Sequence, residues 1–302
     1  MKYSLKRWLF NYKLIVADFV TGIGLFWLVV EISSYSTDGD VDRYLKSISL
    51  FSCVAALIFI FTAIKNAPKT TFSYKLRDKD NFIEVKVGDA FSNGGSLVIP
   101  FNNYFDVSLG GNVKKANSLQ NQLIKKFYSD KEEHLETDIS KKIDLEMVPF
   151  EIGTVVEVEQ KEKMFYLLVN STKKPNNRVE STTDDFLLSL SKLWTYIALE
   201  SGRNSIITIP LISTAHGRIT NINRQTAIKE IIESYIESSK LLNIADKLII
   251  SIHPNDLKKG EIDLDEIDDF LRFSCSHYKI VKFSAKVEGQ EDSPSSIESI
   301  SR

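Results

Sequence analysis

Two long apolar stretches near the amino end constrain this chain most. Residues 14–30 (LIVADFVTGIGLFWLVV) carry one charge, Asp18, and residues 47–64 (SISLFSCVAALIFIFTAI) carry none. At about 1.5 Å of rise per helical residue, each stretch covers roughly 25–27 Å, near the bilayer core thickness of about 30 Å. A cleaved signal peptide fits poorly because a second stretch follows so closely. We predict a two-helix transmembrane hairpin within residues 1–66, with a pair of buried core helices as the alternative.

Charges that flank the two stretches predict their orientation. Basic residues gather at the outer ends, namely Lys2, Lys6, Arg7 and Lys13 before the first stretch and Lys65, Lys69, Lys75 and Arg77 after the second. Acidic residues dominate the connection at residues 31–46. The positive-inside rule therefore predicts that both termini are cytoplasmic and that the connection lies outside.

Asp18 is the ionisable residue inside the first apolar stretch. An acid in lipid is costly and is usually functional or paired. Asp18 lies about one turn from the cytoplasmic end, so it can also reach the headgroups or Lys13. The sequence leaves both roles open.

Beyond residue 70 the pattern predicts one α/β domain over residues 71–286, followed by a polar, disordered tail at residues 287–302. The expected strands are residues 82–87, 97–101, 154–158, 164–169, 205–211, 247–252 and 278–283; the expected helices are residues 113–128, 184–200, 223–238 and 264–273, with a short one within 130–147. This alternation indicates three α/β/α layers. The strand pair at 154–169 makes the sheet mixed.

Composition excludes several classes of protein. The net charge of −2 lacks the basic excess that is typical of nucleic-acid binding. Cys53 and Cys275 are too few for a disulfide framework or a Cys-rich zinc site. His134, His253 and His277 lack metal-like spacing to acids or cysteines, and no serine or cysteine lies in a nucleophile elbow. We therefore expect no metal, no cofactor and no nucleic-acid partner.

Two loops combine glycines with small polar residues directly after an apolar strand. The first spans residues 98–112 and ends in Leu-Gly-Gly-Asn, and the second spans residues 209–218. In open α/β sheets, ligands bind beyond the carboxyl ends of the strands. Glycine-containing loops that enter a helix N-terminus favour anions. A diphosphate between the two loops is the physical expectation, and ordinary connecting loops are the alternative.

Residues 82–252 resemble a macro domain, the module that binds ADP-ribose. Residues 87–90 (VGDA) are similar to the family's Gly-Asp-Ile signature, and residues 97–103 resemble the strand and loop that end in an Asn-Ala-Ala-Asn run. Residues 212–217 (ISTAHG) resemble the Ile-Ser-Thr-Gly-x-x-Gly diphosphate loop, one residue shorter. Pro100 replaces an asparagine that is typical of hydrolytic members, and the triple glycine is absent. These departures favour binding over hydrolysis.

The resemblance implies a role for each matching residue. Asp89 would accept hydrogen bonds from the adenine amino group, with the N–H of Ala90 beside it, and Asn103, or Asn102 in a shifted register, would face the distal ribose. The diphosphate would lie between Gly110, Gly111 and Asn112 on one side and Ser213, Thr214, Ala215, His216 and Gly217 on the other. Arg218 could also pair with phosphate. Simpler roles stay open: Asp89 as a turn cap, and His216 and Arg218 as surface residues.

The apolar stretches and the macro-like domain together resemble the membrane effector of type II Thoeris antiphage defence. In that class a companion TIR-domain enzyme makes an ADP-ribose-derived signal from NAD, and the effector binds it, assembles and damages the bacterial inner membrane. The resemblance implies a multi-pass, homo-oligomeric, non-enzymatic protein whose ligand is an ADP-ribose derivative such as a histidine conjugate. Two alternatives remain: a membrane-tethered ADP-ribosyl hydrolase that uses Asn103 or Asp106, and a passive ADP-ribose-binding module.

Overall fold

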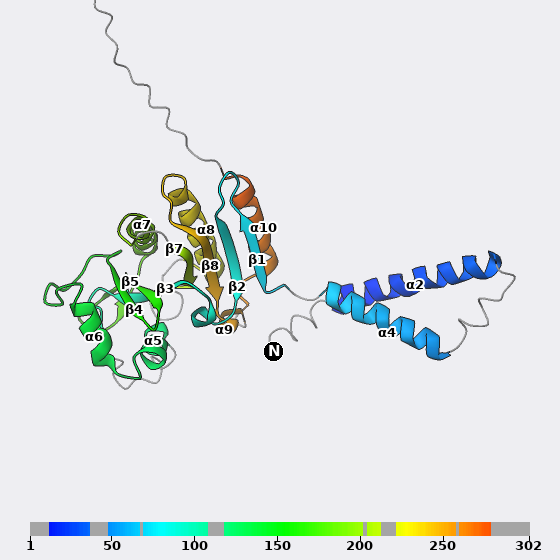
Figure 1. Ribbon diagram of the computed structural model, residues 1–302, viewed down its shortest axis with the longest axis horizontal. Helices are drawn as coiled ribbons and strands as arrows, with labels where there is room; N and C mark the ends of the chain where they lie inside the picture. Colours follow the sequence, from blue (N-terminus) through cyan, green and yellow to red (C-terminus); the bar gives the residue numbers. More distant parts are fainter. Residues whose placement is uncertain are drawn as a thin grey trace, which may run out of the picture.

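The computed structural model describes residues 12–36, 48–66, 69–107, 118–201, 204–212, 222–257 and 260–278. The two apolar stretches form helices α2 (Tyr12–Ser36) and α4 (Ile48–Lys65), which lie beside each other outside the α/β domain (Figure 1). Phe19 of α2 and Phe59 of α4 pack edge to face, with ring centroids 5.6 Å apart. Among the described residues, α2 is the one helix long and apolar enough to cross a membrane, and α4 is a shorter apolar helix.

The described part of the domain contains a mixed sheet, as the sequence predicts. Its strands are β1 (Thr71–Lys75), β2 (Phe82–Val87), β3 (Ser96–Asn102), β4 (Val155–Gln160), β5 (Lys163–Lys173), β6 (Val179–Glu180), β7 (Asn204–Pro210) and β8 (Ala245–Ile252). The strand order is β1-β2-β8-β7-β3-β5-β4, and β6 pairs with β5. The five inner strands, from β2 to β5 in that order, run parallel. The outer strands β1 and β4 run antiparallel to their neighbours.

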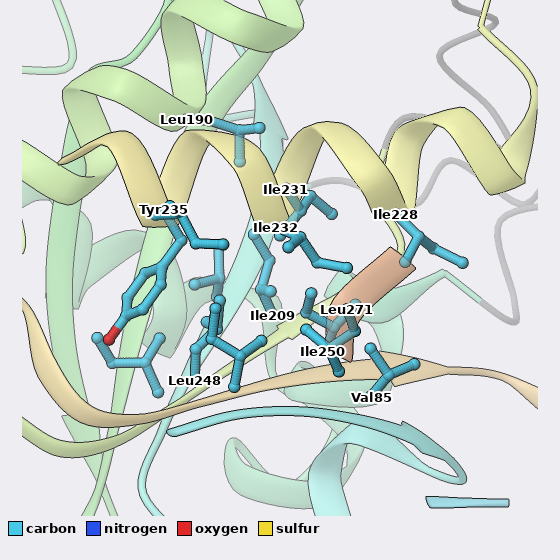
Figure 2. Packing of buried hydrophobic residues seen from close by; sticks show 14 of the residues in the cluster. Val85, Leu190, Ile209, Ile228, Ile231, Ile232, Tyr235, Leu248, Ile250 and Leu271 are labelled. Atoms are coloured by element: carbon cyan, nitrogen blue, oxygen red, sulfur yellow. The ribbon is translucent and has the colours of Figure 1, made fainter. Parts of the chain in front are cut away.

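Helices cover both faces of the sheet because successive strand residues point to opposite sides. Val98 of β3 joins one buried cluster, whereas Leu97 and Ile99 join another. The first cluster includes α7 (Thr183–Leu199), α8 (Arg224–Ser239) and α10 (Leu264–Ser276), and the second includes α5 (Leu119–Phe127) and α6 (Glu132–Ser140). Figure 2 shows residues of α8 lying over Leu248 and Ile250 of β8. The result is the predicted three-layer arrangement.

Helix α7 shows how local signals and packing agree. Thr182 Oγ1 accepts a hydrogen bond from the Asp185 N–H, and the Asp185 carboxylate accepts one from the Thr182 N–H, both at 3.0 Å. This capping box satisfies two backbone donors that the helix cannot satisfy internally. At the other end, buried Trp194 donates to Ser234 Oγ at 2.9 Å and meets the ring of Tyr235 at 5.3 Å. These contacts join α7 to α8.

Several elements differ from the prediction or lie outside the described residues. Strand β1 is an addition, which pairs with β2 at the sheet edge. Of the expected closing strand 278–283, only Tyr278 is described, and its hydroxyl donates to the Ser239 carbonyl at 2.9 Å. Helix α5 begins at Leu119, and residues 113–117 of the expected helix lie outside the described residues, as do residues 287–302.

Candidate functional site

The parallel strands place their carboxyl ends at one edge of the sheet, here called the carboxyl edge. Strand β2 is followed there by Asp89, β3 by Asn103, β7 by Ile212 and β8 by His253. Loops from these strands therefore converge, which is where open α/β sheets bind ligands. Of the residues that the sequence singles out, Asp89, Asn102 and Asn103 are described, and they lie at this one edge.

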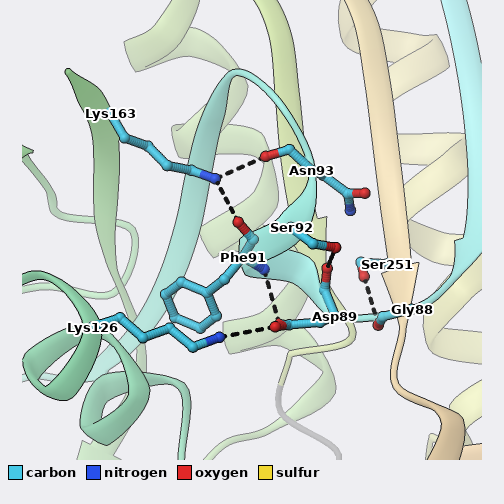
Figure 3. A network of polar contacts seen from close by, with 8 residues as sticks. All are labelled: Gly88, Asp89, Phe91, Ser92, Asn93, Lys126, Lys163 and Ser251. Atoms are coloured by element: carbon cyan, nitrogen blue, oxygen red, sulfur yellow. Dashed lines mark hydrogen bonds and ion pairs between the residues drawn. The ribbon is translucent and has the colours of Figure 1, made fainter. Parts of the chain in front are cut away.

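Asp89 lies just beyond the end of β2, where it contacts Phe91, Ser92 and Lys126 (Figure 3). The Gly88 N–H donates to the Ile252 carbonyl at 3.0 Å, which ties this end to β8. The Asp89 side chain caps the short helix η1 (Ala90–Ser92) by accepting from the Phe91 N–H at 3.0 Å. Its other oxygen pairs with Lys126 Nζ of α5 at 2.8 Å. About half of the Asp89 side chain, 48%, still faces solvent.

Electrostatics keep the Asp89 carboxylate ionised. Burial alone would raise its pKa, but the hydrogen bonds from Lys126 and the Phe91 N–H, with the positive charge of Lys126, lower the pKa below its usual value. An ionised carboxylate only accepts hydrogen bonds, and its two oxygens offer about four acceptor positions. Asp89 can therefore still accept from an amino group such as that of adenine.

Lys126 is the partner of Asp89 that the sequence does not identify. Its Nζ lies 4.5 Å from the centroid of the Phe91 ring. That ring stacks on Phe127 at 6.1 Å, and Phe127 in turn meets Phe165 at 4.7 Å. This row of rings fixes η1 against α5 and so brings Lys126 to Asp89. Helical periodicity places Lys126 on the surface of α5 but carries no signal for this partner.

Asn102 and Asn103 lie at the end of β3, and both are buried. Asn102 Oδ1 accepts from the Tyr104 N–H at 2.9 Å, and Asn103 Oδ1 accepts from the Lys173 N–H at 2.8 Å. The two side-chain oxygens therefore shape the turn after β3. A ribose at this position would meet the amide nitrogens or displace these bonds.

A charged pair and an aromatic ring accompany the asparagines. Lys173 Nζ pairs with Asp106 Oδ2 at 2.5 Å and lies 5.7 Å from the centroid of the Tyr104 ring. Both charged side chains are about 30% exposed, and Tyr104 is 38% exposed. Lys173 is the final residue of β5, so the pair bridges the ends of β3 and β5. Of these residues, the sequence indicates only Asp106 as a candidate near the distal ribose.

The remaining predicted ligand residues lie outside the described residues, namely Gly110, Gly111, Asn112, Ser213, Thr214, Ala215, His216, Gly217 and Arg218. Their flanks are described. The first loop enters α5, where Ser118 Oγ accepts from the Asn121 N–H at 3.1 Å. The second enters α8, where Asn223 Oδ1 accepts from the Thr226 N–H at 2.8 Å. Both loops therefore connect the carboxyl edge to a helix N-terminus, where the helix dipole favours anions.

A cavity of about 480 Å³ lies at the opposite edge of the sheet. It adjoins the starts of β3, β5 and β7 at Ser96, Lys163 and Ser205. It is therefore distinct from the predicted ligand site. Within the described ranges, no group of three or more histidine, cysteine or acidic side chains is arranged to hold a metal ion.

The chain is similar to one protein family and to several solved structures. None of the curated proteins matches the chain. Solved structures of the Oceanobacillus iheyensis macrodomain are similar to this chain. An asparagine-to-alanine mutant has 14% sequence identity and a TM-score of 0.44, and the match covers 68% of this chain and 96% of that chain. The form with ADP has 13% sequence identity and a TM-score of 0.44, and the match covers 67% of this chain and 99% of that chain. A glycine-to-valine mutant with ADPR gives 13% identity, 65% and 99% coverage and a TM-score of 0.44.

The family model described as "Thoeris protein ThsA, Macro domain" matches residues 83–253. This match begins inside β2 and ends directly after β8, so it includes the whole carboxyl edge. It also covers more than half of the 302 residues. The chain therefore belongs to the Thoeris ThsA macro-domain family.

Proposed function

We propose that this chain is a membrane effector of Thoeris defence whose macro domain binds an ADP-ribose-derived signal. Family membership supports the Thoeris context. The observation that carries the binding proposal is the carboxyl edge itself. There the ionised, half-exposed Asp89 lies at the same edge as the ends of β3 and β7, from which the chain continues to the N-termini of α5 and α8.

The layout of the edge suits an elongated dinucleotide. Adenine would bind at Asp89 after β2, and the distal ribose would bind near Asn102 and Asn103 after β3. Strands β8 and β7 lie between β2 and β3, which gives three strand spacings, or roughly 14 Å. The diphosphate would lie between these positions, against the two helix N-termini. A mononucleotide would fill only part of this edge.

The helix pair provides the membrane part of the proposal. Helix α2 has 25 residues and α4 has 18, which correspond to about 37 and 27 Å. Their outward side chains are largely apolar, as those of Val20, Leu28 and Phe61 illustrate. We infer that both helices insert into the inner membrane, with both termini cytoplasmic. Since Tyr12 and Lys65 border the apolar segments, interfacial anchoring of these residues supports that placement.

Signal binding would act by favouring an assembled state of the effector. A ligand shifts an equilibrium only when it binds one state better than the other. We propose that a TIR-domain enzyme supplies the signal. The product of that enzyme would be either free ADP-ribose or a conjugate such as histidine–ADP-ribose. The bound effector then forms a homo-oligomer that disrupts the bilayer. In this account the chain binds its ligand and leaves it intact.

Calorimetric titration of the full chain in detergent micelles tests the binding step. The ligands are ADP-ribose, histidine–ADP-ribose and AMP. After each titration the ligand is recovered, and its mass is measured by mass spectrometry to show whether it is intact. We expect saturable binding, tighter for the ADP-ribose forms than for AMP, with every ligand recovered intact. A cleaved ligand would instead indicate an ADP-ribosyl hydrolase. No binding by folded protein would contradict the proposal.

A further inference from the structure

A groove of about 470 Å³ lies between α2 and α4. One of its ends is charged, because Asp18 and Lys65 line it there. The other end is lined by Leu25 and Leu57, which are both more than 60% exposed. The groove is therefore apolar along most of its length and has a pair of opposite charges at one end.

The charged end is a specific arrangement of side chains. Asp18 Oδ2 accepts hydrogen bonds from Lys65 Nζ at 2.9 Å and from Asn66 Nδ2 at 3.0 Å. Asn66 is held in place by a second bond, from Nδ2 to the Thr62 carbonyl at 2.9 Å. The Asp18 side chain is 34% exposed and that of Lys65 is 59% exposed. Both charges thus have a partner in the chain and still face the groove opening.

The positions along the helices place these charges at the boundary of the apolar segment. Lys65 is the last residue of α4, and the chain continues from there toward β1. From Asp18 to Leu25 the groove extends seven residues along α2, or about 10 Å. If α2 and α4 lie in a bilayer, the charges are at headgroup depth and Leu25 and Leu57 lie within the hydrocarbon.

The helices approach closely at the middle of the groove. A Cβ atom on Gly22 would lie 2.7 Å from Cγ2 of Ile58, a distance that only glycine allows without movement of the isoleucine. This contact forms the floor of the groove and leaves Leu25, Leu57 and Phe61 as its walls. The floor is therefore apolar and formed where the two helices approach closely.

We propose that this groove binds one phospholipid that carries a primary ammonium, of the phosphatidylethanolamine type. Its ammonium would bind Asp18, its phosphate would bind Lys65, and one acyl chain would lie against Leu25, Leu57 and Phe61. The paired opposite charges match a zwitterionic headgroup, and charge-assisted hydrogen bonds are the stronger kind. This inference rests on the proposed membrane insertion of the helix pair.

Charge complementarity favours a headgroup over a second copy of the chain as the occupant. Another copy would present apolar side chains of α2 or α4, such as Val20 and Ile60. Those side chains would desolvate Asp18 and Lys65 and offer them no hydrogen bonds, which is costly. An anionic lipid without an ammonium could bind its phosphate to Lys65 but would offer no cationic donor to Asp18.

Native mass spectrometry of the full chain, released from mixed-lipid nanodiscs, tests the proposal. The nanodiscs contain equal amounts of phosphatidylethanolamine, phosphatidylcholine and phosphatidylglycerol with identical acyl chains. We expect one phosphatidylethanolamine per chain, retained roughly tenfold over the other two lipids, as suits hydrogen bonds to charged groups. Asp18→Asn and Lys65→Met should each abolish the preference.

Two matched variants control for charge alone. Glu31→Gln removes an acid of α2 that lies outside the groove. Lys13→Met removes a lysine that lies outside the groove at the start of α2, the helix end nearer to Asp18. Both should keep the lipid preference. Equal retention of the three lipids by wild-type protein would overturn the proposal, as would a preference that survives Asp18→Asn and Lys65→Met. If Asp18→Asn or Lys65→Met changed the oligomeric state without changing the bound lipid, the groove would be an interface between copies instead.

Alkaline carbonate extraction of membranes separates failure of this inference from failure of the proposed function. Wild-type chain that stays in the membrane pellet but shows no lipid preference contradicts the lipid site alone. Chain that carbonate releases into the supernatant contradicts membrane insertion, and the lipid site with it. Nucleotide binding by the macro domain is independent of both results.

Discussion

Asp89 connects three parts of the domain through one carboxylate. It follows β2, caps η1 and pairs with Lys126 of α5. The Gly-Asp dipeptide predicts a functional Asp89, because its position after a strand and its resemblance to a family signature are both local properties. Lys126 lies 37 residues away, and its proximity depends on packing of the Phe91 and Phe127 rings. Residue-scale signals therefore reveal one partner of this pair and not the other.

Replacement of Asp89 separates its ligand role from its structural role. We expect Asp89→Ala to weaken ADP-ribose binding roughly 10- to 100-fold, the effect of losing a hydrogen bond to a charged group. The lost cap of η1 should lower the free energy of unfolding by only about 1 kcal/mol. Calorimetry and chemical denaturation measure the two effects. Asp80→Ala removes an exposed acid that pairs with Lys75 and should change neither; affinity of Asp89→Ala within twofold of wild type would exclude Asp89 from the site.

The lowered pKa of Asp89 also predicts the pH dependence of binding. Because its pKa in the folded protein lies below the ordinary value of 3.8, the carboxylate is ionised at every pH above that value. Its contribution is lost only as the pH falls through the lowered pKa. Affinity for ADP-ribose should therefore show no Asp89-linked step between about pH 5 and 8. A step in that range that disappears in Asp89→Ala would contradict this assignment.

Among the elements, the connection from η1 to β3 depends on one glycine. Gly95 has a φ of +73°, and a Cβ there would lie 2.2 Å from the Ile206 carbonyl oxygen. Its neighbour Gly94 has no positive φ, and a Cβ there would lie 4.0 Å from the nearest atom, in the Ile206 side chain. Of these two positions, Gly95 is therefore the one that must be glycine for the chain to pass close to β7 on its way from η1 to β3.

These two glycines form a matched pair for measuring that constraint. We expect Gly95→Ala to destabilise the domain by about 3 kcal/mol or more, because backbone strain and a clash with backbone combine. Gly94→Ala should change the free energy of unfolding by no more than about 0.5 kcal/mol. Urea denaturation of the full chain in detergent compares them. Equal stabilities would show that the turn relaxes around an added side chain.

Most elements could be predicted from sequence, including the short helix α6 within residues 130–147, but the edge strand β1 could not. Strands β2, β3, β7 and β8 and helices α7, α8 and α10 carry clear periodicity, and the structure confirms them. Strand β1 has five residues, TFSYK, of which only Phe72 is buried. Its strand conformation comes from pairing with β2 rather than from its own pattern. Tertiary pairing of this kind leaves no local signal.

For the candidate site too, some features could be predicted from sequence and others could not. Its location at the ends of β2, β3 and β7 could be predicted, because parallel strands share a carboxyl edge. The pairing of Lys173 with Asp106, 67 residues apart, could not. Neither could the pairing of Lys65 with Asp18 across 47 residues. Each pair requires knowledge of which elements become neighbours, so the sequence predicts the place of the site better than its contacts.

In the whole molecule, the helix pair of α2 and α4 precedes the domain whose carboxyl edge we propose as the nucleotide site. Helix α4 ends at Lys65, and β1 begins at Thr71, so a short connection separates the two parts. Strand β1 pairs with β2, whose end carries Asp89. The chain thus runs from the helix pair to the proposed adenine site through two adjacent strands. If the proposed function holds, a ligand-driven change at this edge would have a short covalent route to the helix pair.

Release of a trapped dye from vesicles tests the coupling most directly. Full chain is reconstituted into lipid vesicles, and ADP-ribose or histidine–ADP-ribose is added. We predict that at least one of them triggers leakage, that AMP does not, and that Asp89→Ala requires roughly 10- to 100-fold more ligand. Saturated nucleotide binding to the inserted chain, with no leakage from either ADP-ribose form, would contradict it.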